Sequence, residues 1–298
     1  MFKGINKHYL ILHAIVFMWG FSPILGRLIT ADVWQLVWFR LILTIGVMFL
    51  YLKLSKQDLR VSKKHLWQLT GIGLIIAIHW LAFYQAIKVS NISVTMVAFS
   101  TGTLFSSIIE PLFLKRRVRF YEVIIGLIIM GAIALIFSIE SQYWLGIILG
   151  ILAAFTSALF SVFNSILAHQ VKSSVLSFYE LSAAALGLTV FVVLNGSFNA
   201  DFFVLDQNSI IGLLLLSIVC TVVPFITSVN LSKYISPYTI VLTVNLESVY
   251  AIIWAILFFE ENKEVKPTFY LGMVIILFAI FLNTWLRRLS DKKSEQIS

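Results

Sequence analysis

Long apolar stretches follow one another along almost the whole chain, and only short polar breaks separate them. A helix needs about 20 residues to cross the roughly 30 Å of hydrocarbon in a lipid bilayer. The stretches do not alternate with a period of two, so they favour helices over the strands of a membrane barrel. They predict an all-α membrane protein with ten transmembrane helices, at residues 9–28, 33–53, 66–87, 92–114, 121–139, 144–168, 174–195, 209–231, 238–259 and 268–287.

The composition agrees with a location in the bilayer. Hydrophobic residues make up 60% of the chain and charged residues 12%, which is too little polar surface for a protein in water. The net charge is +8, but most Lys and Arg residues lie in alternate breaks; the exceptions are Arg27, Lys88, Lys263, Lys266 and the intramembrane Arg40. The positive-inside rule therefore predicts a multi-pass protein with both termini in the cytoplasm, and we expect no nucleic-acid partner.

The second half of the chain repeats the pattern of the first half. An offset of 146 aligns Gly126 with Gly272, and an offset near 140 places Arg40 beside Glu180. We therefore predict two five-helix repeats, over residues 1–140 and 141–298, the second with a cytoplasmic C-terminal tail. Because five is an odd number, the second repeat enters the membrane from the opposite side. Such inverted repeats are typical of secondary transporters, whose substrate site lies near the midplane between the halves.

Four charged side chains fall well inside the predicted helices, namely Arg40, Glu110, Glu180 and Glu247. Each costs at least about 2.5 kcal/mol on insertion scales, so each is a candidate functional residue. Arg40 is positioned to attract an anionic group of a substrate, and its repeat partner Glu180 to take up a proton or another cation. A structural pairing with backbone carbonyl groups, or extension of Arg40 to the membrane interface, is the alternative.

Glu247 lies nearest to the midplane of the membrane. A buried carboxyl group that gains and loses a proton is what proton coupling requires, so Glu180 and Glu247 are the predicted coupling residues. The alternative for Glu247 is a permanently protonated acid that donates a hydrogen bond to a neighbouring helix. Glu110 lies close to the basic run at 115–119, where we expect an interfacial ion pair.

Several uncharged residues complete the predicted substrate site. The Gly and Pro residues at 19–26 predict a kink in the first helix, which would free carbonyl groups for a ligand. An aromatic wall is predicted in the third helix. Packing and interhelical hydrogen bonds also explain these residues. The predicted substrate-binding residues are Trp19, Ser22, Arg40, His79, Tyr84, Thr101, Asn164, Tyr179 and Asn245.

Several kinds of chemistry lack the residues that they need. Cys220 is the only cysteine, so no intrachain disulfide and no cysteine metal site can form. The five His residues show no metal-ligand spacing, and the chain has no phosphate-binding loop of the kind that ATPases use. We therefore expect no metal, no cofactor and no catalytic residue, and active transport would draw on an ion gradient.

Short motifs are spread over nearly the whole chain: Trp-Gly-Phe-Ser-Pro at 19–23, Phe-Arg at 39–40, the glycines at 126 and 131, and Leu-Glu-Ser at 246–248 followed by Phe-Glu-Glu at 259–261 and Gly272. Together they resemble the drug/metabolite transporter superfamily, in particular its ten-helix EamA-type members. Ser248 stands where that family usually has Pro. The resemblance implies a secondary carrier of small metabolites, often an exporter of amino acids, in a bacterial inner membrane. It also implies a central cavity lined by both halves.

We therefore expect an alternating-access transporter that exports small metabolites and draws on protons; its partners are a small-molecule substrate, the lipid bilayer and protons. Two other classes stay open. One is the permease subunit of an ATP-driven transporter, for which the break at 54–65 is long enough to hold a coupling helix. The other is a multi-spanning enzyme acting on lipid-linked substrates. It would need a cluster of catalytic side chains at one membrane interface.

Overall fold

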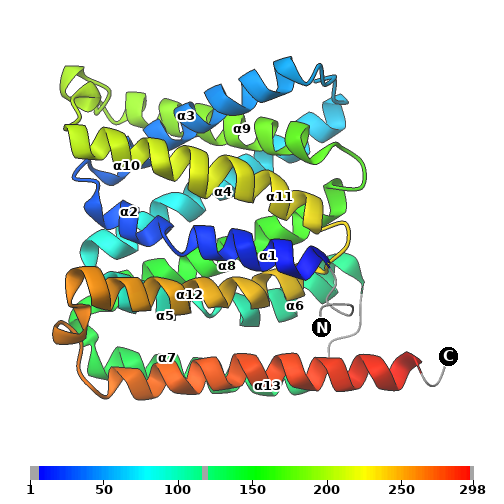
Figure 1. Cartoon of the computed structure of the whole chain (residues 1–298), viewed down its shortest axis with the longest axis vertical. Helices are drawn as coiled ribbons and strands as arrows, with labels where there is room; N and C mark the ends of the chain where they lie inside the picture. Colours follow the sequence, from blue (N-terminus) through cyan, green and yellow to red (C-terminus); the bar gives the residue numbers. More distant parts are fainter. Residues whose placement is uncertain (1–6, 116–119, 296–298) are drawn as a thin grey trace.

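The chain folds into a bundle of helices that run back and forth along one direction (Figure 1). The computed structural model describes residues 7–115 and 120–295, and every regular element in those ranges is helical. The basic residues at 116–119, which contribute to the predicted topology, lie outside the described residues. The elements are α1 (Lys7–Trp19), α2 (Ser22–Leu28), α3 (Val33–Leu54), α4 (Lys63–Val89), α5 (Ile92–Phe99), α6 (Gly102–Leu114), α7 (Phe120–Ile139), η1 (Ser141–Tyr143), α8 (Trp144–Leu167), α9 (Ser173–Leu194), η2 (Ala200–Phe203), α10 (Gln207–Ser217), η3 (Ile218–Val222), α11 (Val223–Leu231), α12 (Pro237–Phe259), η4 (Glu261–Lys263) and α13 (Phe269–Glu295).

Eight helical segments of the described ranges are long and apolar enough to cross a membrane. Two further apolar segments, Phe120–Ile136 and Phe269–Ala279, are shorter. The helices thus confirm an all-α, multi-pass membrane protein, while the count of ten spans stays a prediction. We call the end of the bundle where α1 begins and α13 ends the terminal face, and the other end the far face (Figure 1).

The helices α3 and α9 show the repeat most directly. Both contain 22 residues, and their first residues are Val33 and Ser173, an offset of 140. Arg40 is therefore the eighth residue of α3 and Glu180 the eighth of α9. The two helices pack against each other in opposite directions. Repeat-related helices that run in opposite directions are what an inverted repeat requires.

The fourth and ninth predicted helices also correspond, at an offset of 145. Asn91 caps the start of α5 and Ser236 caps the start of α12, each through a side-chain oxygen that accepts a backbone N–H. Lys115 ends α6 and Glu260 ends α12, both in the left-handed conformation, with φ of 53° and 55°. Non-glycine residues rarely adopt this conformation, so its occurrence at equivalent positions supports the repeat.

Three of the long helices are interrupted. Pro23 lies at the start of α2, where a residue without an N–H group cannot continue the helix from α1, as the predicted kink requires. Pro224 follows the π-helical turn η3 between α10 and α11. Ser100 and Thr101 separate α5 from α6. Interrupted helices leave backbone groups unpaired near the membrane centre, which is where transporters place their ligands.

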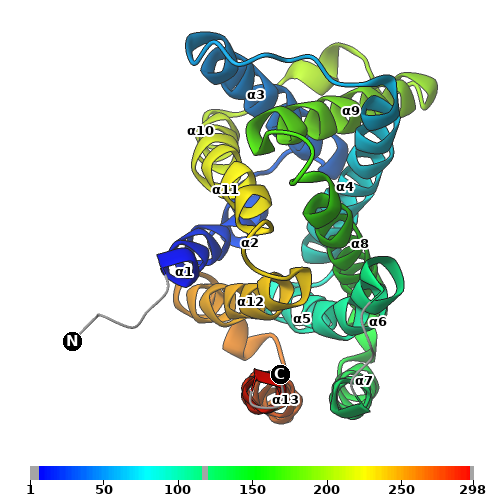
Figure 2. The ribbon, with the colours of Figure 1, turned by 90° about the vertical axis from the view of Figure 1, so that its right-hand side faces the viewer.

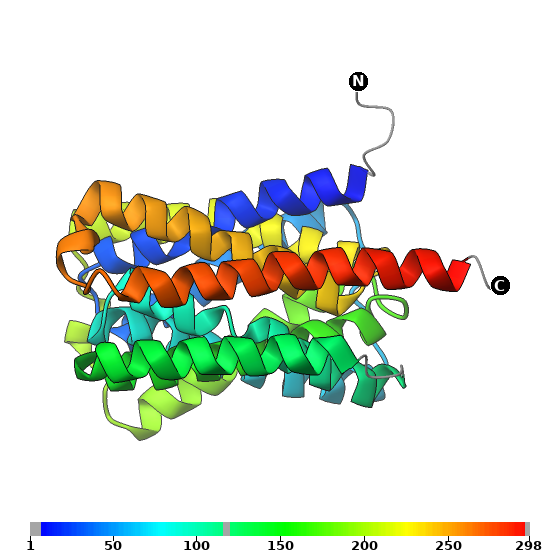
Figure 3. The same cartoon turned by 90° about the horizontal axis from the view of Figure 1, so that it is seen from below.

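The packing separates a central group of helices from an outer pair. α4 contacts both α8 and α9 extensively, and α5 and α6 pack on α8 and α12. α7 and α13 lie side by side along one edge of the bundle, where they pack mainly on each other (Figures 2 and 3). The central group therefore holds the buried polar residues described below.

Gly73 permits the closest contact between α4 and α9, and its replacement by Ala is expected to destabilise the bundle. An added Cβ would lie 2.2 Å from the backbone carbonyl oxygen of Glu180, so the two helices would have to separate. Overpacking of this kind costs about 1–3 kcal/mol. Gly71 on the same helix has no atom within 4 Å of an added Cβ, so Gly71→Ala is the control. Equal melting temperatures of the two variants in detergent would contradict the expected packing.

Candidate functional site

A cavity lies between the two repeats and contains about 720 Å³ of space free of protein atoms, including the part that opens to solvent. Its walls come from α1 to α5, α8, η3, α11 and α12, whereas α9 contributes none of the residues that line it. Six predicted site residues line the cavity: Trp19, Ser22, Arg40, His79, Tyr84 and Glu247. The other lining residues are Trp80, Phe83, Phe99, Ser157, Phe160, Ser161, Thr221, Phe225, Ser228, Ile240, Val241 and Val244.

The cavity extends towards the terminal face. Ser228 and Ile240 line it, and each lies three residues from the terminal-face end of its helix, α11 or α12. At the other end the lining residues include Arg40 and Tyr84, which lie seven and five residues from the far-face ends of α3 and α4. At a rise of 1.5 Å per residue these are depths of roughly 10 Å and 8 Å. Protein therefore covers the cavity on its far side.

Arg40 is held at the deep end of the cavity by three neighbours. Its Nε donates a hydrogen bond to Thr221 Oγ1 at 2.9 Å, and its Nη1 donates one to Tyr84 Oη at 2.6 Å. The guanidinium carbon lies 3.9 Å from the centre of the Trp80 ring, which is a close cation–π contact. These contacts orient the planar guanidinium group.

The charge of Arg40 is not matched by an ion pair within the described residues. A guanidinium group has five N–H donors, and only two of those of Arg40 have a hydrogen-bond acceptor in the described part of the chain. The side chain is nonetheless buried, with 4% of its surface exposed. A buried charge that lines a cavity and lacks a counter-ion is suited to bind an anionic group.

Glu247, on α12, brings an acidic side chain to the cavity that Arg40 also lines. Its side chain is 6% exposed, and no hydrogen bond from the described residues reaches its carboxyl group. It is close enough to Arg40 to interact with it electrostatically. The cavity thus presents an anion-binding group and a carboxyl group to the same space.

His79 and the aromatic side chains form a third part of the wall. His79 Nδ1 lies 2.8 Å from the carbonyl oxygen of Ala153, which can only accept, so Nδ1 carries a hydrogen and donates it to that oxygen. The imidazole ring packs near Phe99 and Phe160, with centroid distances of 5.9 Å and 5.3 Å. This wall suits an apolar or planar part of a ligand.

Five predicted site residues do not line the cavity: Thr101, Asn164, Tyr179, Glu180 and Asn245. Thr101 Oγ1 donates to the Ala98 carbonyl group at 2.7 Å within its own helix turn. Tyr179 Oη donates to the Leu59 carbonyl group at 2.9 Å and so ties α9 to the segment between α3 and α4.

The remaining three contact neighbouring helices. Asn245 Nδ2 donates to Thr103 Oγ1 and so joins α12 to α6. Asn164 Nδ2 donates to Glu180 Oε2 at 3.3 Å, which joins α8 to α9 behind the cavity wall. All five residues thus form interhelical or local hydrogen bonds.

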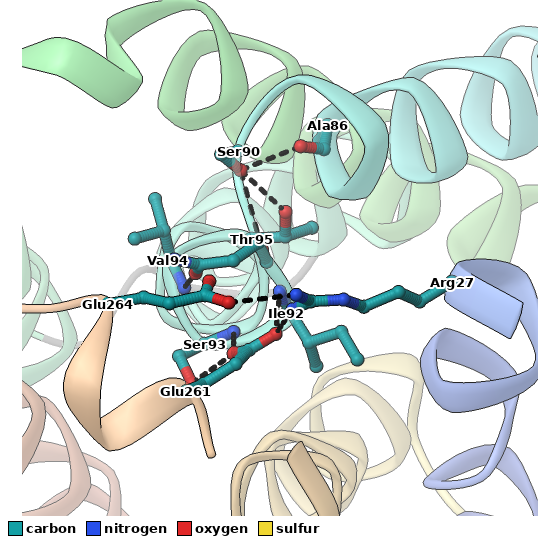
Figure 4. A network of polar contacts seen from close by, with 10 residues as sticks. Arg27, Ala86, Ser90, Ile92, Ser93, Val94, Thr95, Glu261 and Glu264 are labelled. Atoms are coloured by element: carbon teal, nitrogen blue, oxygen red, sulfur yellow. Dashed lines mark hydrogen bonds and ion pairs between the residues drawn. The ribbon is translucent and has the colours of Figure 1, made fainter. Parts of the chain in front are cut away.

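A network of polar contacts centred on Glu261 lies at the far-face end of the bundle, and Figure 4 shows its side chains. Arg27 of α2 forms ion pairs with Glu261 and with Glu264, the latter at 2.8 Å. The fully buried carboxylate of Glu261 also accepts hydrogen bonds from the backbone N–H groups of Ile92 and Ser93, at 2.9 Å and 2.7 Å, and from Ser93 Oγ at 2.6 Å. It therefore caps the N-terminus of α5 and links α2, α5 and η4.

Asp206 makes a second far-face contact between the repeats. Its carboxylate accepts hydrogen bonds from the hydroxyl groups of Ser209 and Thr30, of which the Ser209 bond is 2.6 Å. These bonds hold the pKa of Asp206 below its usual value, so the group is charged at neutral pH. Lys88 Nζ donates to the carbonyl groups of Ile29 and Ala31, at 3.0 Å and 2.7 Å, and fixes the loop between α2 and α3.

At the terminal face, a second carboxylate caps the start of α12, which is the repeat equivalent of α5. Glu110 near the end of α6 accepts a hydrogen bond from the backbone N–H of Tyr238 at 2.6 Å. Tyr238 of α12 is equivalent to Ser93 of α5 at the offset of 145, so Glu110 and Glu261 cap equivalent amides. Most of the basic run expected to pair with Glu110, residues 116–119, lies outside the described residues.

Removal of the Glu261 carboxylate is expected to weaken the far face strongly. Glu261→Ala leaves three hydrogen-bond donors at the start of α5 without their acceptor and leaves Arg27 with Glu264 as its ion-pair partner, which costs about 3 kcal/mol. Glu264 is partly exposed and its carboxylate pairs with Arg27, so Glu264→Ala should cost less than about 1 kcal/mol. Melting temperatures in detergent would check the difference. An equal fall in melting temperature for the two variants would show that the capping of α5 by Glu261 contributes little to stability.

Comparison with known proteins agrees with this geometry. The family model of the EamA-like transporter family matches residues 6–138 and 144–285. A solved structure described only as "Crystal structure of protein" is similar over 95% of this chain and 99% of its own, with a TM-score of 0.68 and 14% sequence identity, which shows a shared fold. No curated protein matches the chain. On the family match, supported by the apolar helices and the two-repeat fold, the chain belongs to the EamA-like transporter family and is a membrane transporter of small molecules.

Proposed function

We propose that this chain is a secondary transporter that exports small metabolites with both a carboxylate and an ammonium group, such as amino acids, in exchange for protons. One observation carries the proposal. The unpaired guanidinium group of Arg40 and the carboxyl group of Glu247 line one cavity between the two repeats.

The cavity offers a separate contact for each part of such a substrate. The free N–H groups of Arg40 would bind the carboxylate, because a guanidinium group recognises a carboxylate through two parallel hydrogen bonds. Glu247 would accept the ammonium group. The aromatic side chains and His79 would pack against the substrate side chain. Recognition of the two charged groups of the substrate would explain why Arg40 and Glu247 have no ion-pair partner among the described residues.

Proton coupling follows if the Glu247 carboxyl group binds the substrate ammonium group and a proton in turn. A protonated Glu247 has no charge to hold the ammonium group, so substrate and proton would compete for it. Exchange of one for the other, together with alternating exposure to the two faces, makes an antiporter. Such a carrier would move its substrate out while protons enter.

The expected sidedness fits an exporter. Most Lys and Arg residues lie in the breaks of the terminal face, which the positive-inside rule assigns to the cytoplasm of a bacterial inner membrane. The cavity extends towards that face, and the Glu261 network lies at the other. The conformation would therefore be the one that loads substrate from the cytoplasm.

An ATP-driven permease is a weaker candidate. Such a subunit needs a coupling helix in a cytoplasmic break, and residues 55–62 between α3 and α4 contain no helix.

The purified protein in liposomes would test the proposal. Counterflow of labelled amino acids should identify a substrate, and an acidic lumen should raise its uptake, because protons leaving the lumen drive an antiporter. A substrate whose uptake rises with an alkaline lumen would contradict proton exchange. Absence of counterflow for every amphoteric solute would contradict the substrate class.

A further inference from the structure

A second group of buried polar side chains lies on α8 and α9, outside the residues that line the cavity. Glu180 and Ser177 are completely buried, and Asn164 is 3% exposed. Asn164 Nδ2 donates to Glu180 Oε2 at 3.3 Å. Three other oxygen atoms of these side chains have no hydrogen-bond partner among the described residues: Glu180 Oε1, Asn164 Oδ1 and Ser177 Oγ.

The three unpartnered oxygens come from neighbouring positions. Ser177 precedes Glu180 by three residues on α9, so the two side chains lie on one face of the helix, one turn apart. Asn164 approaches Glu180 from α8 through its hydrogen bond. Three buried oxygen atoms without a hydrogen-bond partner are costly in a hydrocarbon environment, unless a bound proton or cation satisfies them.

No charged group in the described part of the chain forms an ion pair with Glu180. The helices packed against α9 are α3, α4 and α11, and α8 reaches Glu180 through Asn164; α8 and α11 carry no titratable side chain. On α3 and α4 the titratable side chains are Arg40, Tyr51, Lys53, Lys63, Lys64, His65, His79, Tyr84 and Lys88. None of them forms an ion pair with Glu180, whose carboxyl group has Asn164 as its one hydrogen-bond partner among the described residues.

We propose that Glu180, Asn164 and Ser177 form a binding site for a monovalent cation, a proton or Na⁺, separate from the substrate cavity. A proton would be held on the Glu180 carboxyl group and shared by hydrogen bond with Asn164 Oδ1 or Ser177 Oγ. Na⁺, which prefers oxygen ligands, would be held by the same oxygens. The inference rests on the proposed function only in that it treats the chain as a gradient-coupled carrier.

The position of the site gives it a route to the cavity. Ser157, Ser161 and Asn164 follow one another at i, i+4 and i+7 on α8, which places them on one face of the helix. Ser157 and Ser161 line the cavity, and Asn164 lies one turn further on. A cation in the cavity would therefore reach Glu180 along a polar stripe rather than through lipid.

Thermal unfolding of the purified protein in detergent tests the site without a transported substrate. Na⁺ would be compared with choline at constant ionic strength, and each at an acid and an alkaline pH. If Na⁺ is the ligand, it should raise the melting temperature of the wild type by roughly 5 °C at concentrations about 100-fold above its Kd. If the ligand is a proton, Na⁺ should have no specific effect, and the melting temperature should fall from acid to alkaline pH.

The variant Glu180→Gln should remove whichever response the wild type shows, because the amide is neutral at every pH and binds cations weakly. Glu260→Gln, which changes an exposed carboxyl group outside both the cavity and this site, is the control and should keep that response. The proposal is overturned if Glu180→Gln responds as the wild type does, or if the wild type responds to neither cation.

Should Glu180→Gln fail to fold, Ser177→Ala removes one oxygen and leaves the carboxyl group. It should shift the half-maximal Na⁺ concentration upward or move the pH midpoint, and an unchanged response would overturn the site. Failure of the liposome screen would leave these results intact and would count against the proposed function alone. Successful transport with no Glu180-dependent response would count against the site alone.

Discussion

Replacement of Arg40 by Ala should raise the KM for an amphoteric substrate roughly 100-fold, because loss of a buried charge contact costs about 3 kcal/mol. The substitution removes the charge from the deep end of the cavity and leaves Thr221, Tyr84 and Trp80 without the group that they orient. Counterflow at several substrate concentrations in liposomes would measure the change.

Arg40→Lys is the informative partner of that variant. Lysine keeps the positive charge but cannot contact Thr221 and Tyr84 at once while offering two parallel donors to a carboxylate. Its KM should fall between those of the wild type and Arg40→Ala. Identical KM values for all three proteins would show that Arg40 has a structural role and does not bind substrate.

Replacement of Glu247 by Gln should abolish uptake driven by a pH gradient and spare substrate exchange. The amide cannot release or take up a proton, so the carrier loses the step that links the gradient to transport. It can still accept a hydrogen bond from an ammonium group, which is why exchange should continue at reduced affinity. Parallel measurements of gradient-driven uptake and of counterflow in the same liposomes would separate the two activities.

Two results would contradict that role. Gradient-driven uptake at the wild-type rate would remove Glu247 from the coupling mechanism. Loss of exchange together with driven uptake, in a protein that stays monodisperse and melts like the wild type, would show that Glu247 serves binding alone.

Much of the helix pattern follows from the sequence, because an apolar run stops where the chain leaves the bilayer. The predicted spans 33–53 and 144–168 differ by one residue from the observed α3 (Val33–Leu54) and α8 (Trp144–Leu167). The repeat is also visible in the sequence, since Arg40 and Glu180 occupy the same position of equally long helices.

The residues that line the cavity are harder to predict, because a buried membrane helix is apolar on every side and its pattern does not show which side faces a cavity. Tyr179 and Asn245 are polar enough to be candidates, yet they form hydrogen bonds elsewhere. Ser161 lies in the wall, although its sequence context is typical of helix packing. Only the arrangement of the neighbouring helices decides between such cases.

Glu261 shows a different limit of the sequence. It lies in a polar break among other charged residues, and a charged residue in such a place is expected to face water. Instead it is completely buried, because the start of α5 presents two backbone N–H groups and a hydroxyl group to its carboxylate. The partners come from a segment more than 160 residues away, so no local pattern could indicate them.

The paired caps also restrict how the bundle can move. Glu261 follows the end of α12 and binds the start of α5, while Glu110 lies near the end of α6 and binds the start of α12. The helix formed by α5 and α6 is thus bonded to α12 at both of its ends, by Glu261 at one end and by Glu110 at the other. A change of access would then leave this pair of helices intact, and the contacts that would change are those with the helices outside it, among them the Arg27 ion pair.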